Sequence, residues 1–170
     1  MTRRSITKRA AVVTATALVA VGSLAVGVSS AGPESAPRPV PKTSKARIAG
    51  LFDGWNAALR TGDAETVADR YADDAVLLPT VSNKVRTDHA GIVDYFEHFL
   101  VNKPTGRKIQ TIVNVLDGNS AIDTGVYEFT LTDPDTGAKR LVKARYTYEY
   151  EKRGGEWLIV NHHSSAMPEG

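Results

Sequence analysis

The sequence predicts an α+β domain in which helices pack on one face of a curved antiparallel sheet. Two patterns lead to this prediction. Between residues 48 and 100, apolar side chains recur every three or four residues, which is typical of helices with one buried face. From residue 107 onwards they alternate, and short segments rich in Gly, Asp and Asn separate the alternating stretches. Helices followed by a run of hairpin-linked strands are typical of the α+β class.

The first half of the folded region predicts three helices and one short strand. Asp63 and Asp88 are suited to cap the N-termini of the second and third helices. Gly62 suits the C-terminal end of the first helix. The short strand ends at Pro79. In chain order, the predicted elements are helix 46–60, helix 64–71, strand 75–78 and helix 88–100.

The second half predicts four long strands joined by tight turns. The turns are Asp117-Gly118-Asn119, a loop at 133–137 and Gly154-Gly155, all rich in residues that favour turns. Consecutive strands linked in this way form an antiparallel meander. The predicted strands span residues 107–116, 121–132, 138–152 and 156–165.

Residues 1–31 predict an export signal peptide. Four basic residues lie within the first nine, followed by an uncharged run at 10–28 and small residues that suit cleavage after Ala31. The first residues resemble the twin-arginine motif, so both that route and the general secretory route stay open. A retained membrane anchor is the alternative to cleavage. We expect residues 32–45 to be a Pro-rich linker and residues 46–168 to be the domain.

Charge and composition restrict where the protein is expected to be located and which partners it is expected to bind. The chain has a net charge of +2, but the predicted signal peptide holds four basic and no acidic residues. The remaining 17 basic and 19 acidic residues give the mature chain a net charge of −2, so we expect no nucleic-acid binding. We expect a secreted or cell-envelope exterior protein with no stable membrane insertion after signal cleavage. The absence of Cys excludes disulfides and thiol catalysis.

Four stretches of the sequence resemble a known superfamily. They are LFDGWNAAL at 51–59, YADDA at 71–75, GEWLIV at 155–160 and NHHSS at 161–165. With the order of elements, they are similar to the nuclear transport factor 2-like (SnoaL-like) superfamily. They resemble most the branch that holds the association domain of calcium/calmodulin-dependent kinase II and exported bacterial SgcJ/EcaC-family proteins. The resemblance covers about residues 48–168. It implies a cone-shaped cystatin-like fold, a cavity between the sheet and the helices, and a homodimer formed through a sheet face.

The last hairpin decides which side chains share a face. If Gly154-Gly155 is a two-residue turn and the strands pair without a bulge, His162 lies on the same face as Arg145. His163 and Asn161 then lie on the other face, with three tyrosines, which we expect to be core or a subunit interface. A β-bulge would swap these assignments. The three tyrosines are Tyr146, Tyr148 and Tyr150.

Five residues are candidates for ligand binding. Arg145 is interpreted either as an anion-binding group in the cavity or as a partner in a salt bridge. His162 is interpreted either as a general base or as a hydrogen-bonded structural residue. The kinase association domain has an Arg where this chain has Ser164, so the resemblance does not carry anion specificity over. The candidates are Arg145, His162, Tyr127, Asn161 and His163.

The sequence predicts neither a metal site nor a cofactor. Adjacent His side chains diverge from a strand, and no His-x-His or dinucleotide-binding pattern is present. The leading hypothesis is a homodimeric domain that binds a small organic ligand, anionic or neutral, in its cavity. One alternative is a non-catalytic oligomerisation or interaction module. The second alternative, which the resemblance implies, is an SgcJ/EcaC-like isomerase or oxidoreductase that acts on polyketide-like substrates.

Overall fold

The computed structural model describes residues 43–168. The predicted signal peptide and most of the predicted linker lie outside these residues. Within the described part of the chain, no helix is long and apolar enough to cross a membrane. The elements follow the predicted order. They are α1 (Lys45–Leu59), α2 (Ala64–Ala68), β1 (Tyr71–Leu78), α3 (His89–Leu100), β2 (Thr105–Val115), β3 (Ser120–Thr132), β4 (Lys139–Arg153) and β5 (Glu156–Ala166).

Short polar side chains begin all three helices. Ser44, Asp63 and Asp88 each accept a hydrogen bond from a backbone N–H in the following turn. Gly62 has a φ of 75°, a left-handed conformation that glycine adopts without strain. The predicted caps at Asp63 and Asp88 are therefore confirmed. Helix α2 is shorter than predicted, because the chain already enters β1 at Tyr71.

The five strands form one sheet in the order β1-β5-β4-β3-β2. Strands β2 to β5 are an antiparallel meander, as predicted. Strand β1 instead runs parallel to β5, so the sheet is mixed and not purely antiparallel. A parallel neighbour requires a long connection, and the segment from α3 through β4 supplies it.

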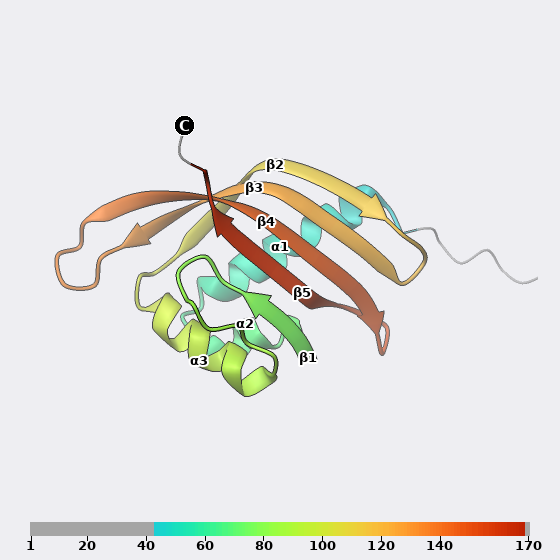
Figure 1. Cartoon of the computed structure of the whole chain (residues 1–170), viewed down its shortest axis with the longest axis horizontal. Helices are drawn as coiled ribbons and strands as arrows, with labels where there is room; N and C mark the ends of the chain where they lie inside the picture. The colour runs from blue at the N-terminus through green and yellow to red at the C-terminus, as the bar shows by residue number, and fades with distance from the viewer. Residues whose placement is uncertain (1–42, 169–170) are drawn as a thin grey trace, which may run out of the picture. The chain divides into compact units, whose positions relative to one another are not determined.

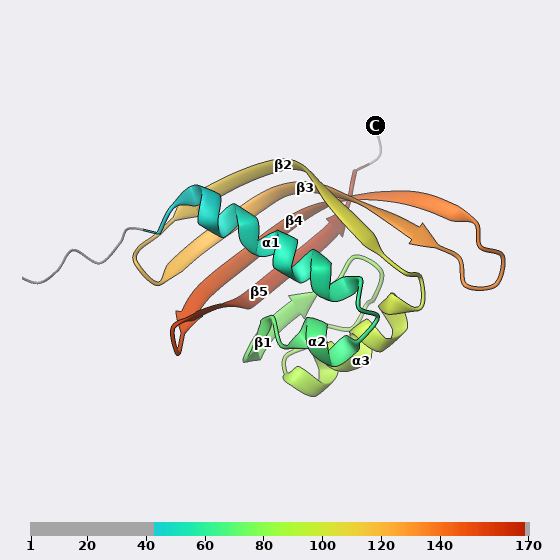
Figure 2. The same ribbon diagram turned by 180° about the vertical axis from the view of Figure 1, so that it is seen from behind.

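The sheet is curved, and α1, α2 and α3 lie on its concave side (Figures 1 and 2). Figure 2 shows α1 crossing that side in front of β2 and β3, while α2 and α3 lie together beside β1. This arrangement leaves one sheet face covered and the other open. The predicted α+β class, with helices on one face of a curved sheet, is confirmed.

The covered face forms the aromatic core of the domain. Along β4, Tyr146, Tyr148 and Tyr150 alternate with outward-facing side chains and are at most 2% exposed. From α1, Phe52 and Trp55 pack against this face and are equally buried. Burying a large apolar side chain stabilises a fold by roughly 1.5–3 kcal/mol, so α1 is a main contributor to stability. The tyrosine face is core, one of the two alternatives that the sequence left open.

Candidate functional site

A β-bulge at Val160 sets the direction of the side chains that follow it in β5. Because side chains alternate along a strand, one extra residue moves every later side chain to the opposite face. His162 therefore pairs with Tyr148 in the core, and His163 points to the outer face. The prediction that His162 shares a face with Arg145 is wrong.

The bulge also separates the five predicted ligand-binding residues. His162 and Tyr127 are buried on the concave side, 4% and 2% exposed. Arg145 and His163 are exposed on the outer face, where both line a shallow groove of about 340 Å³. Asn161 precedes His162 and by alternation also belongs to the outer face. The expectation that Arg145 binds an anion inside the cavity is therefore corrected.

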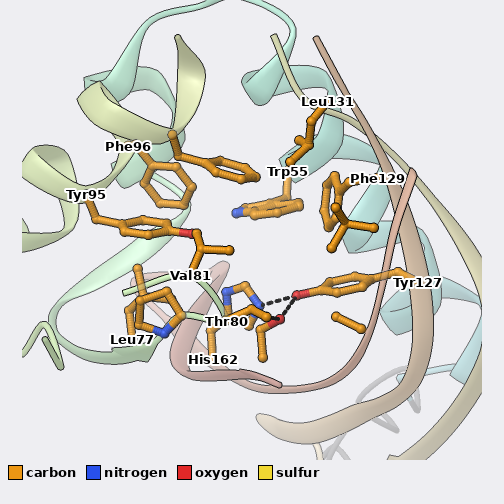
Figure 3. A pocket seen from close by; sticks show the side chains of 15 residues that line it. Trp55, Leu77, Thr80, Val81, Tyr95, Phe96, Tyr127, Phe129, Leu131 and His162 are labelled. Carbon is orange, nitrogen blue, oxygen red and sulfur yellow. Dashed lines mark hydrogen bonds between the residues drawn. The ribbon is translucent and has the colours of Figure 1, made fainter. Parts of the chain in front are cut away.

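A cavity lies between the concave face of the sheet, α1 and α3 (Figure 3), and the centre of a water molecule can move through about 40 Å³ of it. Hydrogen bonds bring four of its polar side chains together: Thr80, Tyr127, His162 and Ser164. None of the residues that line it is an Asp, Glu, Lys or Arg. The hydroxyl of Tyr95 adds a further polar atom at the wall. The apolar wall consists mainly of Trp55, Leu77, Phe96, Phe99, Phe129, Leu131 and Val142.

Buried hydrogen bonds connect α1 to the His162 ring. The indole Nε1–H of Trp55 donates to the hydroxyl of Tyr71 at 3.0 Å. The Tyr71 hydroxyl lies 2.9 Å from Nδ1 of His162. Trp55 can only donate through Nε1, so the Tyr71 oxygen accepts from it and donates its own proton to Nδ1. Helix α1, strand β1 and strand β5 are joined by this connection.

The series of hydrogen bonds continues from His162 to the cavity wall. Nε2 of His162 lies 3.4 Å from the hydroxyl of Tyr127, and Tyr127 donates to Oγ of Ser164 at 2.5 Å. Ser164 is in turn hydrogen-bonded to the hydroxyl of Thr80. Figure 3 shows these last contacts as one continuous path beside the cavity. Five side chains from β1, its following loop, β3 and β5 are thus held by Trp55 of α1.

Burial keeps the His162 ring neutral. Removal from water disfavours the imidazolium form and, with a smaller effect from His163, lowers the pKa of His162 from 6.5 to about 3. The ring is packed against Tyr148, with 4.1 Å between the ring centroids, and edge-on against Trp55. At neutral pH, its one accepting nitrogen is already occupied by Tyr71. His162 therefore matches the structural alternative better than the general-base alternative.

A second buried polar cluster lies under the N-terminal half of α1. The carboxylate of Asp123, which is 0% exposed, accepts from the Tyr146 hydroxyl at 3.0 Å and from Nζ of Lys108 at 3.3 Å. Burial raises the pKa of Asp123, and the nearby Lys108 opposes that rise. Asp123 is therefore partnered by both Tyr146 and Lys108. In the described part of the chain, no three acidic or His side chains lie close enough to hold a metal ion.

Arg86 anchors the loop that carries Thr80. Its side chain is 8% exposed, and its guanidinium donates to the carbonyls of Lys84 and Gly91 at 2.6 and 3.1 Å and pairs with Asp94 at 3.1 Å. Backbone hydrogen bonds also tie Arg86 to β1. These contacts hold both ends of the loop between β1 and α3 at the edge of the cavity.

Sequence reasoning missed several residues of the hydrogen-bonded chain. Trp55 and Thr80 were not among the candidates, and Ser164 was considered only as the position at which the kinase association domain has an Arg. The position of Thr80 depends on the parallel pairing of β1 with β5, in which Leu78 lies opposite His163. The one available signal was Pro79, which ends the strand just before Thr80.

Comparisons with known proteins agree with the fold. The model of the calcium/calmodulin dependent protein kinase II association domain matches residues 44–168. None of the functionally curated proteins matches the chain. A solved structure from Xanthomonas campestris, assigned to the same association domain, is 59% identical with a TM-score of 0.73. The match covers 76% of this chain and 93% of the other.

More distant solved structures share the fold alone. The association domain of C. elegans CaMKII is 14% identical with a TM-score of 0.59, and the match covers 72% of this chain and 95% of that one. A nuclear transport factor 2-like protein from Salmonella enterica is 16% identical with a TM-score of 0.63, and the match covers 73% of this chain and 91% of that one. The fold, the match over residues 44–168 and the Xanthomonas structure lead to one conclusion: this chain belongs to the calcium/calmodulin-dependent protein kinase II association-domain family.

Proposed function

We propose that this protein binds a small, uncharged, mainly apolar molecule in the cavity between its sheet and its helices, without a cofactor. The observation that carries the proposal is the lining of the cavity. Aromatic and aliphatic side chains surround it together with several hydroxyl groups. Its lining holds no Asp, Glu, Lys or Arg, and burial keeps His162 neutral. Such a lining is typical of sites for small organic ligands.

The geometry favours binding over acid–base catalysis. The Nδ1 atom of His162 accepts from Tyr71, so the ring offers no unoccupied base to a ligand. Burial raises the pKa of the Tyr127 hydroxyl well above its ordinary value, which makes it a poor acid. The SgcJ/EcaC-like enzyme alternative therefore receives no support from these two residues. Export through the N-terminal segment stays a prediction from the sequence.

Blocking the cavity tests the proposal. Val142 lines it, whereas the neighbouring Leu141 points outward and is 66% exposed. We expect a small uncharged probe such as cyclohexanone to shift NMR signals of the cavity residues in the wild-type chain and in Leu141→Phe. The same probe should cause no such shifts in Val142→Phe. If Val142→Phe does not fold, Val81→Phe at the exposed rim replaces it.

Two results would contradict the proposal. One is the absence of any shift in the wild-type chain at millimolar probe. The other is a shift of equal size in the blocked and wild-type chains, which would place the probe elsewhere on the surface.

We further propose that the outer face of the sheet associates with a second copy of the chain. The name of the family to which the chain belongs denotes association. On this face, Ile109 and Ile112 of β2 are 45% and 50% exposed. The carboxylate of Glu128 is paired there with Arg107 at 2.9 Å, so it does not stand as an uncompensated charge. Apolar side chains beside neutralised charges suit a protein–protein contact.

Sedimentation velocity tests this association. The wild-type chain should sediment as a dimer at micromolar concentration. Ile112→Lys should give monomers, whereas Leu116→Lys, at an equally exposed residue outside the strands, should leave the dimer intact. A wild-type monomer, or equal effects of the two substitutions, would contradict it.

A further inference from the structure

The hydrogen-bonded chain beside the cavity has a fixed direction. It starts at Trp55, whose indole N–H donates and has no accepting lone pair. The hydroxyl oxygen of Tyr71 therefore receives this bond, and the Tyr71 proton goes to Nδ1 of His162, 2.9 Å away. In the neutral ring only one nitrogen carries a proton, so that proton sits on Nε2 and points towards Tyr127.

The same donor-to-acceptor order of the hydrogen bonds continues from Tyr127 to the rim of the cavity. Tyr127 donates to Oγ of Ser164, which is 8% exposed. In the described part of the chain, Ser164 has only Tyr127 and Thr80 as side-chain partners. The Ser164 proton therefore goes to Thr80, because the reverse arrangement would bury it without an acceptor.

Thr80 is the last residue of this series of hydrogen bonds, and its hydroxyl is a donor. Its oxygen accepts from Ser164, and no acceptor for its own O–H is found among residues 43–168. Thr80 is half-buried and lines the cavity (Figure 3). The Tyr95 hydroxyl also lines the cavity, but a substitution of Thr80 leaves it in place, so it does not account for a change in ligand preference that such a substitution causes.

We propose that the cavity selects ligands that carry a hydrogen-bond acceptor on an apolar body, such as a small ketone, because Thr80 presents a donor at its polar wall. This proposal rests on the proposed binding function. The carbonyl oxygen accepts from Thr80, while the carbon skeleton lies against Phe96, Phe99 and Phe129. A hydrocarbon of the same shape fills the same space but leaves the Thr80 proton unpartnered.

A matched pair of probes measures this preference. Cyclohexanone and methylenecyclohexane have nearly the same shape, and only the first has an acceptor. Dissociation constants are measured by NMR titration of the full-length chain, and the ratio of hydrocarbon to ketone is compared between the wild type and Thr80→Val. We expect the substitution to lower this ratio about three- to tenfold, the effect of losing one hydrogen bond.

Two further variants serve as controls. Thr80→Ser keeps the hydroxyl and should keep the wild-type ratio. Thr87→Val removes an exposed hydroxyl from the same connection and should also leave the ratio unchanged. If both probes bind but the ratio is the same in Thr80→Val, the donor role of Thr80 is wrong while the binding function stands. If neither probe binds the wild-type chain, the binding function fails, and this proposal fails with it.

Discussion

The hydroxyl of Tyr71 lies 2.9 Å from Nδ1 of His162, although 91 residues separate them in the chain. The parallel pairing of β1 with β5 brings the two residues together. Trp55 donates to the same hydroxyl, so Tyr71 is the point at which the first helix, the edge strand and the last strand meet. This contact anchors the polar wall of the cavity.

Removing the Tyr71 hydroxyl should destabilise the domain. Tyr71→Phe leaves the Trp55 N–H and Nδ1 of His162 buried without partners, which costs about 1–3 kcal/mol of unfolding free energy. Urea denaturation followed by fluorescence measures the change. Tyr148→Phe is the matched control, because the buried Tyr148 hydroxyl has no partner among residues 43–168 and its removal should leave stability unchanged or slightly higher. Equal losses in the two variants would show that the Tyr71 hydroxyl has no special role.

Acid should weaken the fold through His162. The pKa of His162 is about 3 in the folded chain and 6.5 when unperturbed, so the unfolded chain binds a proton at higher pH. The stability due to the neutral ring is complete above about pH 6.5 and is lost as the pH falls towards 3, at up to about 1.4 kcal/mol per pH unit.

His162→Gln isolates this contribution, because the amide does not titrate and the other ionisable groups remain. The unfolding free energy of the variant should fall less steeply than that of the wild type between pH 6.5 and 4. Parallel pH profiles for the two proteins would mean that His162 is not the group responsible.

Lys108 should stabilise the fold by compensating the buried Asp123 carboxylate. In Lys108→Met the carboxylate loses the Nζ partner at 3.3 Å, and breaking a buried ion pair costs on the order of 3 kcal/mol. Arg153→Met serves as the control. Arg153 pairs with Asp74 and Glu151 at the surface, where the three side chains are 40–73% exposed, so its removal should leave the midpoint of thermal unfolding nearly unchanged. If Arg153→Met lowered the midpoint of thermal unfolding as much as Lys108→Met, burial would not explain the stabilising effect of the Lys108–Asp123 pair.

Two glycines should respond in opposite ways to alanine. At Gly125, a Cβ would overlap the backbone carbonyl of Gln110 in the neighbouring strand, so Gly125→Ala should cost about 3 kcal/mol. At Gly50 in α1, a Cβ meets open space, so Gly50→Ala should stabilise the helix by about 0.5–1 kcal/mol. Thermal unfolding measures both. A tolerated Gly125→Ala would mean that β2 and β3 are not paired as described.

Local signals in the sequence predicted most of the fold. Asp63 and Asp88 begin helices because their carboxylates accept backbone hydrogen bonds, and Gly154-Gly155 forms the last hairpin because both residues adopt positive φ. These features depend on neighbouring residues only. The parallel contact between β1 and β5 depends on residues far apart in the chain, which no local pattern reveals.

The candidate site was only partly predictable. The run Trp157-Leu158-Ile159-Val160 is apolar at every position, so it contains no alternation that would locate the bulge at Val160. Without the bulge, the two His residues exchange faces. Tyr127 and His162 line the cavity, whereas Arg145, a further candidate, lies on the outer face of the sheet.

The protonation of the His162 ring is the most direct test of the polar wall described here. Long-range nitrogen–proton correlation NMR distinguishes which ring nitrogen carries the proton. We expect a neutral ring protonated on Nε2, with Nδ1 accepting from Tyr71, and no change in this state from pH 7 down to about pH 4. A ring protonated on Nδ1, or one that becomes charged near pH 6.5, would reverse or break the chain of hydrogen bonds from Trp55 to Thr80 and contradict the account.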